Sequence, residues 1–102
     1  MLFFVAEAFT GTPFHLSILT PEQVVFDGDV EYVEAPGSER YFGVLAHYAA
    51  MVKALASGTL KVRYTDCKVE RWQVDGGFFE VSANRATVLA DAVTMPAGSS
   101  KG

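Results

Sequence analysis

Apolar and polar residues alternate in short runs along this chain, and such alternation is typical of half-buried β-strands. The first run is a clear example, because Phe14, Leu16 and Ile18 are separated by single polar residues. A sustained 3.6-residue apolar period, which would indicate helix, does not occur in the sequence. The segments that we predict as strands are residues 14–18, 24–26, 29–35, 43–45, 49–55, 60–64, 67–74, 78–82 and 86–93.

Turn signals separate these segments at intervals of about ten residues. Thr20-Pro21 ends the first strand because proline cannot donate to a ladder, and Asp27-Gly28 predicts a two-residue hairpin. Val30 and Val33 are three residues apart, so we expect a β-bulge or burial on both faces between them. The other predicted turns are Pro36-Gly37, Ser57-Gly58, Thr65-Asp66, Asp75-Gly76-Gly77 and Ala83-Asn84. Many short strands at this spacing indicate an all-β sandwich or barrel in a single domain.

The inward phase of the predicted strands gives a candidate core. Trp72 shares a face with Val74, so we expect its ring to be buried, and we expect the Phe78-Phe79 pair to join it. The expected core residues are Leu16, Ile18, Val62, Tyr64, Trp72, Val74, Val81, Val88 and Leu89.

Composition agrees with a small globular domain, because half of the 102 residues are hydrophobic and 13% are aromatic. The charge is uneven: residues 1–39 hold seven acidic residues and no lysine or arginine, whereas residues 40–102 hold five acidic and eight basic residues, giving −7 and +3. A partner of the first part should therefore be neutral or basic. Nucleic acid is not expected, since it requires clustered Lys and Arg. The single cysteine, Cys67, fits a reducing compartment and is expected as a packed or idle thiol on a strand.

Catalytic and metal-binding motifs are absent from the sequence. No Gly-x-Ser-x-Gly element positions a nucleophile, and His47 has no Cys, Asp or Glu at ligand spacing. The glycine-bracketed segment 37–43 lacks the Lys-Ser/Thr of a phosphate loop, so we interpret it as a surface loop. Asp27, Asp29 and Glu31 would form a carboxylate row on one strand face, which is typical of a solvated edge. The residues indicate a binding or structural module with no catalytic, cofactor or metal site.

Several segments, taken in order, resemble the epsilon subunit of ATP synthase. The match runs without a gap over residues 14–93. The segments that carry it are FHLSILTPE (14–22), VFDGDV (25–30), VEAPGSE (33–39), FGVL (42–45), VDGGFFEV (74–81) and TVLAD (87–91).

This resemblance implies a β-sandwich of roughly ten strands, the N-terminal domain of the epsilon subunit. In that family the domain lies at the foot of the central stalk of a proton-translocating F-type ATP synthase, on the cytoplasmic face of a bacterial inner membrane. The implied partners are the gamma subunit and the c-ring, with a transient contact to the catalytic head. The implied role is that of a peripheral, non-catalytic rotor subunit that couples proton flow to ATP synthesis without spanning the membrane or holding a cofactor.

The resemblance also implies contact regions. The loop expected to face the c-ring comprises Ser38, Glu39, Arg40, Tyr41 and Phe42, and the residues expected close to gamma and the ring are His47, Tyr48, Ala49 and Met51. The chain departs from the family here, because Arg40 replaces a usual glycine and Tyr41 a frequent acid, while Tyr48 and Ala50 replace a usual histidine and proline. We therefore expect Tyr41 and Phe42 to contact the c-ring through their aromatic side chains. We also expect the fold to tolerate their removal, because the loop lies outside the strand pattern.

Many family members continue as a helical hairpin that can bind ATP. We expect here a short form without the hairpin, which neither binds nor hydrolyses ATP. Its expected parts are an N-terminal extension at 1–13, the β-sandwich domain at 14–93 and a flexible tail at 94–102. The alternative hypothesis, which composition alone would favour, is a stand-alone β-sandwich that binds peptide or carbohydrate.

Overall fold

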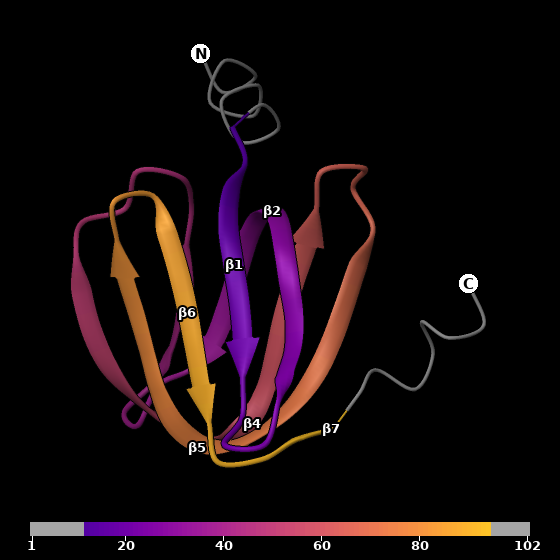
Figure 1. The fold of residues 1–102 in the computed structure, drawn as a ribbon. Helices are drawn as coiled ribbons and strands as arrows, with labels where there is room; N and C mark the ends of the chain where they lie inside the picture. The colour runs from indigo at the N-terminus through magenta and orange to yellow at the C-terminus, as the bar shows by residue number, and fades with distance from the viewer. Residues whose placement is uncertain (1–11, 95–102) are drawn as a thin grey trace.

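The computed structural model describes residues 12–94, and all regular elements within this range are β-strands (Figure 1). The predicted all-β class is confirmed, and residues 12–94 contain no helix that could cross a membrane. The expected N-terminal extension and C-terminal tail fall almost wholly outside the described residues. The strands are β1 (Phe14–Leu19), β2 (Val24–Pro36), β3 (Tyr41–Val44), β4 (Met51–Tyr64), β5 (Val69–Ser82), β6 (Arg85–Ala90) and β7 (Val93–Thr94).

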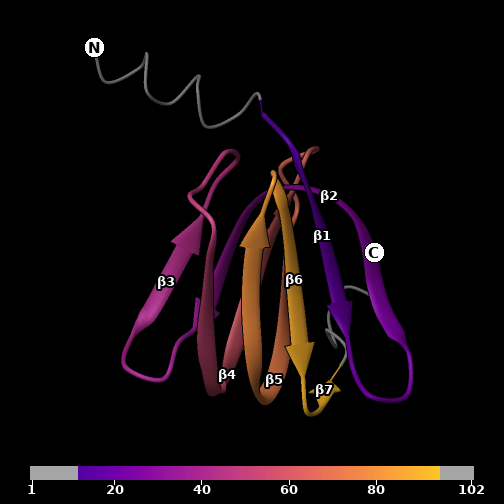
Figure 2. The same ribbon diagram turned by 60° about the vertical axis from the view of Figure 1, so that its left-hand side comes forward.

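The strands form one sheet that closes on itself. Hydrogen-bonded neighbours follow the order β1-β6-β5-β4-β2, and β2 pairs again with β1. The pairing of β1 with β6 is parallel, whereas the other pairings are antiparallel. The long strands curve strongly, so that their two halves contribute to different walls around one core (Figure 1). β3 extends the sheet beyond β2 as an outermost strand (Figure 2).

The strand count is seven over residues 12–94, so the expectation of roughly ten is wrong. Three predicted turns, at Asp27-Gly28, Ser57-Gly58 and Asp75-Gly76-Gly77, lie inside the long strands β2, β4 and β5. The prediction divided each of these long strands in two at its glycine.

The paired glycines of β5 mark a corner of the sheet. Gly76 and Gly77 have φ values of +74° and +117°, which L side chains rarely adopt, and the Leu89 carbonyl oxygen occupies the place that a Cβ on Gly77 would need. Val74 and Phe79 are both fully buried, although strict alternation along a strand would place them on opposite faces. The inward phase of β5 therefore reverses at this corner.

A β-bulge lies in the middle of β2, where the spacing of the valines predicted it. Val30 pairs with Tyr64 and Tyr32 with Arg63, so Glu31 between them has no partner on β4. Both Val30 and Glu31 are buried as a result.

The core prediction is largely confirmed. Trp72 is 3% exposed, and Tyr64 is half-buried against the core. Leu89 and Phe78 were also expected in the core, and this expectation is wrong. Leu89 is 44% exposed and Phe78 is 53% exposed. The other correctly predicted core residues are Leu16, Ile18, Val62, Val74, Phe79, Val81 and Val88.

Two of the short turns contain non-glycine residues at positive φ. Ala83 and Asn84 connect β5 to β6 with φ values of 53° and 60°, as a two-residue hairpin of the primed type requires. The turn predicted at Thr65-Asp66 is confirmed, but Cys67 belongs to this turn, with φ of 73°, and not to a strand.

Candidate docking surfaces

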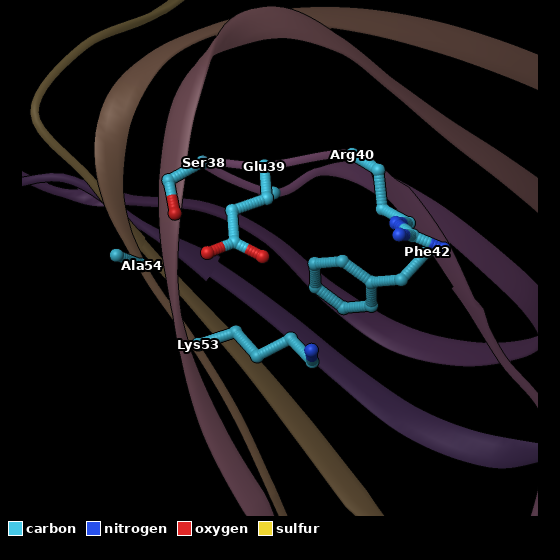
Figure 3. A pocket seen from close by; sticks show the side chains of 7 residues that line it. Ser38, Glu39, Arg40, Phe42, Lys53 and Ala54 are labelled. Carbon is cyan, nitrogen blue, oxygen red and sulfur yellow. The ribbon is translucent and has the colours of Figure 1, made fainter.

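The segment expected to face the c-ring begins as an exposed bend between β2 and β3. Ser38, Glu39 and Arg40 form this bend, and the Ser38 amide donates to the Ala54 carbonyl at 3.1 Å, which ties the bend to β4. An open cavity of about 460 Å³ lies beneath it, with the Glu39 carboxylate, the Phe42 ring and the Lys53 ammonium around the same space (Figure 3). The lining carries charges of both signs, from Glu39, Arg40 and Lys53. It is therefore better suited to contact a polar protein surface than to bind a single ion.

The two aromatic residues of the same segment are part of the fold. Both lie on β3, and the Phe42 ring meets the buried Phe79 ring edge-on at 5.1 Å, with Lys53 Nζ 5.4 Å from its centroid. The Tyr41 hydroxyl accepts a hydrogen bond from the Thr59 amide at 3.1 Å, while half of the residue stays exposed. The expectation that this segment lies outside the strand pattern is therefore wrong for Tyr41 and Phe42, although it holds for residues 38–40, and Phe42 contributes to packing.

The second expected contact region is the connection between β3 and β4. His47, Tyr48 and Ala49 are exposed there, whereas Met51 packs partly buried against the core. The His47 amide donates to the side-chain oxygen of Asn84 at 2.7 Å. Sequence reasoning treated Asn84 only as a turn residue.

An exposed apolar row crosses five strands of the sheet, and sequence reasoning missed it. Its members are register neighbours in turn from β2 through β1, β6 and β5 to β4, so their side chains share one face of the sheet. Val24 is 62% exposed, and Leu19 is half-buried. We call this set the apolar row; it consists of Val24, Leu19, Leu89, Phe78 and Ala54.

The apolar row is flanked by acidic residues and a shallow hollow. A cavity of about 260 Å³ adjoins Leu19, Phe78 and Leu89. The next positions along the strands carry Asp27 and Glu80, both exposed. A signal for the row did exist in the sequence, since Gly76-Gly77 stands directly before Phe78 and allows the phase reversal that turns this ring outward.

The outward positions on the second halves of β2 and β4 and on the first half of β5 are mostly polar instead, with Val69 as an exposed apolar exception. Lys61 Nζ lies 3.5 Å from Glu34 Oε1, and the Arg63 guanidinium lies over the Tyr32 ring at 5.5 Å. Burial raises the pKa of the Tyr32 hydroxyl above its usual value. Arg71, which pairs with Lys61 across the strands, is exposed. We call the outward positions of these strand segments the charged face. Lys61 there has a neighbour of opposite charge, Glu34, and one of like charge, Arg71, as expected of a solvated surface.

Arg63 also lies near Glu31, the one residue of the predicted acidic row that is buried. Its Nε lies 3.8 Å from Oε1 of the buried Glu31, and neither atom has a hydrogen-bond partner. Asp27 and Asp29 remain exposed, so the expected three-carboxylate row is wrong at Glu31.

Asp27 instead gathers polar partners on β1. It accepts hydrogen bonds from His15 Nε2 and, at 2.9 Å, from Ser17 Oγ, and these bonds hold the pKa of Asp27 below its usual 3.8. The Oδ1 atom of Asp29 lies 3.4 Å from His15 Nδ1. Because Ser17 donates to the carboxylate and not to the imidazole, the cluster does not form a nucleophile–base pair. Within residues 12–94 no group of three or more His, Cys, Asp and Glu side chains could hold a metal ion.

Comparison with known proteins identifies the family. Residues 13–96 match the model of the ATP synthase Delta/Epsilon chain beta-sandwich domain. The chain belongs to this family. A relative named ATP synthase epsilon chain, from Chlorobaculum tepidum, is 40% identical over 81 residues, which cover 79% of this chain and 92% of the relative. The epsilon chain of Protochlamydia amoebophila is 45% identical over 78 residues, but this chain spans only 53% of its length.

Solved structures of ATP synthases share the fold of this epsilon-type domain. A chain of the Euglena gracilis mitochondrial enzyme, from an OSCP/F1/c-ring assembly, matches with a TM-score of 0.78 and 22% identity, covering 81% of this chain and 53% of its own. A chain from the central stalk/c-ring structure of Tetrahymena thermophila matches with a TM-score of 0.68 and 19% identity, covering 79% and 65%. The relatives are named as epsilon chains, which are non-catalytic subunits of an enzyme complex, so the prediction of a non-catalytic epsilon-type chain is confirmed.

Proposed function

We propose that this chain is a rotor subunit of a proton-translocating F-type ATP synthase, and that it links the gamma subunit to the c-ring. In this role it transmits rotation between the two and couples proton flow to ATP synthesis without making or breaking bonds itself. It would act as a peripheral subunit on the cytoplasmic face of a bacterial inner membrane. Family membership supports the role, and so do the central stalk and c-ring named for the matching structures.

The apolar row is the observation that carries the gamma contact. Exposed outward positions of an antiparallel sheet are normally polar, as most of them are on the charged face. Five apolar residues adjoining in register over five strands are costly to leave in water, and such patches usually mark protein interfaces. Phe78 and Leu89 lie next to each other in the row, so they form its natural anchor.

The surroundings of the row define the chemistry of its partner. Asp27, Glu80 and Asp91 are exposed along its margins, so a complementary surface is apolar in the middle and basic at its rim. Tyr48, which is exposed on the β3–β4 connection, is proposed as a second contact with gamma.

The bend at residues 38–40 is proposed as the c-ring contact. It is exposed, it projects from the end of β2, and the cavity beneath it offers charges of both signs from Glu39, Arg40 and Lys53. Tyr41 is the exposed aromatic residue of this segment, whereas Phe42 is engaged with Phe79. The ring contact therefore depends on Tyr41 together with the bend.

The rotor role is favoured over a stand-alone binding module. A carbohydrate-binding site usually exposes aromatic platforms, and the single tryptophan of this chain, Trp72, is buried. The relatives at 38–40% identity, nearly all of whose length this chain covers, are named as ATP synthase epsilon chains.

Capture of gamma tests the proposal. The tagged full chain is expected to retain the purified gamma subunit of the same organism in equal amounts. Phe78→Asp, which charges the middle of the apolar row, should abolish the capture. Gln73→Asp is the matched control, since it adds the same charge at an exposed position of the same strand on the charged face, and it should leave capture intact. Absence of gamma on a folded wild-type chain would contradict the proposed function.

A further inference from the structure

Three segments that are distant in sequence meet at Asn84. The residue lies in the turn between β5 and β6, and its side-chain Oδ1 accepts a hydrogen bond from the His47 amide at 2.7 Å. Its backbone oxygen accepts a longer one, 3.4 Å, from the amide of His15 in β1. The side chain of Asn84 thus ties the β3–β4 connection to the β5–β6 hairpin.

The turn itself does not require this side chain. Asn84 has φ of 60° in the second position of a two-residue hairpin, where glycine is the usual residue because it meets no steric cost at positive φ. Asparagine tolerates this conformation, but glycine would serve the turn equally well. What the asparagine adds is an acceptor for an amide 37 positions away in sequence.

The amide that Asn84 binds belongs to His47, the residue of the connection that has a positive φ. His47 has φ of 62°, a conformation that non-glycine residues rarely adopt, so an outside contact is needed to select it. Ala46 before it and Met51 after it pack against the core. The exposed residues Tyr48 and Ala49 therefore project from a short segment that is fixed on both sides.

We propose that Asn84 is a positioning residue that fixes the β3–β4 connection and so presents Tyr48 to the gamma subunit in a preformed conformation. The second part rests on the proposed function. A segment that is ordered before binding loses less conformational entropy when the partner arrives. Removing the acceptor should leave the interface residues in place but increase the entropy lost on binding.

Two substitutions at Asn84 separate this role from that of the turn. Asn84→Gly removes the acceptor and keeps the positive φ, whereas Asn84→Asp keeps an oxygen acceptor of the same size. In the full chain, Asn84→Gly should speed hydrogen exchange of the His47 amide and increase the nanosecond motion of residues 47–49 seen by NMR. Asn84→Asp should leave both near the wild-type values, and the thermal unfolding midpoint of Asn84→Gly should not fall.

Affinity for purified gamma supplies the second readout. We expect binding to weaken roughly three- to tenfold in Asn84→Gly, the effect of one hydrogen bond, and to be kept in Asn84→Asp. Unchanged exchange and motion at His47 in Asn84→Gly would overturn the positioning role. Faster exchange with unchanged affinity would overturn the presentation of Tyr48. A wild-type chain that fails to bind gamma would overturn the proposed function and that presentation together, while the NMR result would still decide whether Asn84 fixes the connection.

Discussion

The apolar row and the charged face are both outward surfaces of the same closed sheet, and β4 and β5 contribute to both. On the charged face, Lys61 pairs with Glu34 and Arg63 covers Tyr32, so the domain satisfies its own surface. On the apolar row, Phe78 and Leu89 lie beside other apolar residues of the row, and about half of each residue is exposed. The difference shows how a solvated sheet face can be distinguished from a docking face. Exposed side chains of the first interact with one another through charges, whereas the second exposes a contiguous set of apolar side chains.

The largest expected effect separates two adjacent phenylalanines of β5. Phe79 is fully buried, so Phe79→Ala should lower the free energy of unfolding by roughly 3–5 kcal/mol. Phe78→Ala should lower it by only about 1 kcal/mol, because about half of the residue is exposed in the free chain. Chemical denaturation of both variants measures this. Equal losses in the two variants would mean that Phe78 belongs to the core and that the apolar row is not a free surface.

The second prediction compares the two faces in binding. Leu89→Ala should weaken the affinity for gamma by about 1–2 kcal/mol, since it removes part of a desolvated anchor. Arg71→Ala on the charged face should change the affinity by less than about 0.5 kcal/mol, because exposed charges contribute little and are screened by salt. Calorimetric titration of both variants at two salt concentrations tests the order. A larger, salt-dependent loss in Arg71→Ala would transfer the docking site to the charged face.

The third prediction concerns the segment at the c-ring. Tyr41→Ala should reduce proton-driven ATP synthesis more than Arg40→Ala does, because an aromatic contact loses more on truncation than an exposed charge. Phe42→Ala also removes packing on Phe79, so it should lower stability as well and is the weaker test of contact. ATP synthesis by membranes that carry each variant gives the order, with circular dichroism as the control for folding. If Arg40→Ala is the most damaging variant and salt reduces its effect, the contact is electrostatic.

The smallest effect is the acid sensitivity of the Asp27 cluster. Its hydrogen bonds to His15 and Ser17 lower the pKa of Asp27 in the folded chain, so they stabilise the fold above the unfolded pKa of about 3.8. This contribution is lost as the pH falls below that value and through the lowered folded pKa. Asp27→Asn should therefore unfold less steeply with pH below 4. Parallel acid-unfolding curves for both proteins would show that the cluster contributes nothing.

Much of the fold could be predicted from local patterns. Alternation predicts β1 and the second half of β4, the valine spacing predicts the bulge at Glu31, and Trp72 is buried as expected. Local patterns failed at Gly76-Gly77, because the same dipeptide suits a tight turn and a strand corner. Which of the two forms depends on the pairing of β5 with β4 on both sides of the corner, and that is a long-range property.

The docking surface was less accessible to sequence reasoning for the same reason. Once the corner is mistaken for a turn, Phe78 and Leu89 are assigned to the core and the apolar row disappears. The row also joins Val24 to Ala54 through strands that are neighbours only in the closed sheet. The role of Asn84 could not be predicted either, since its hydrogen bond to His47 depends on how the β3–β4 connection folds back.

Thiol accessibility in the assembled enzyme tests the central claim most directly. In a Cys67→Ser background, Phe78→Cys places a single thiol on the apolar row, and Arg71→Cys places one on the charged face. Both thiols should react with a maleimide in the free chain. After assembly with gamma and the c-ring, the thiol at position 78 should become protected while that at position 71 stays reactive. A reactive thiol at 78 together with a protected one at 71 would contradict the account.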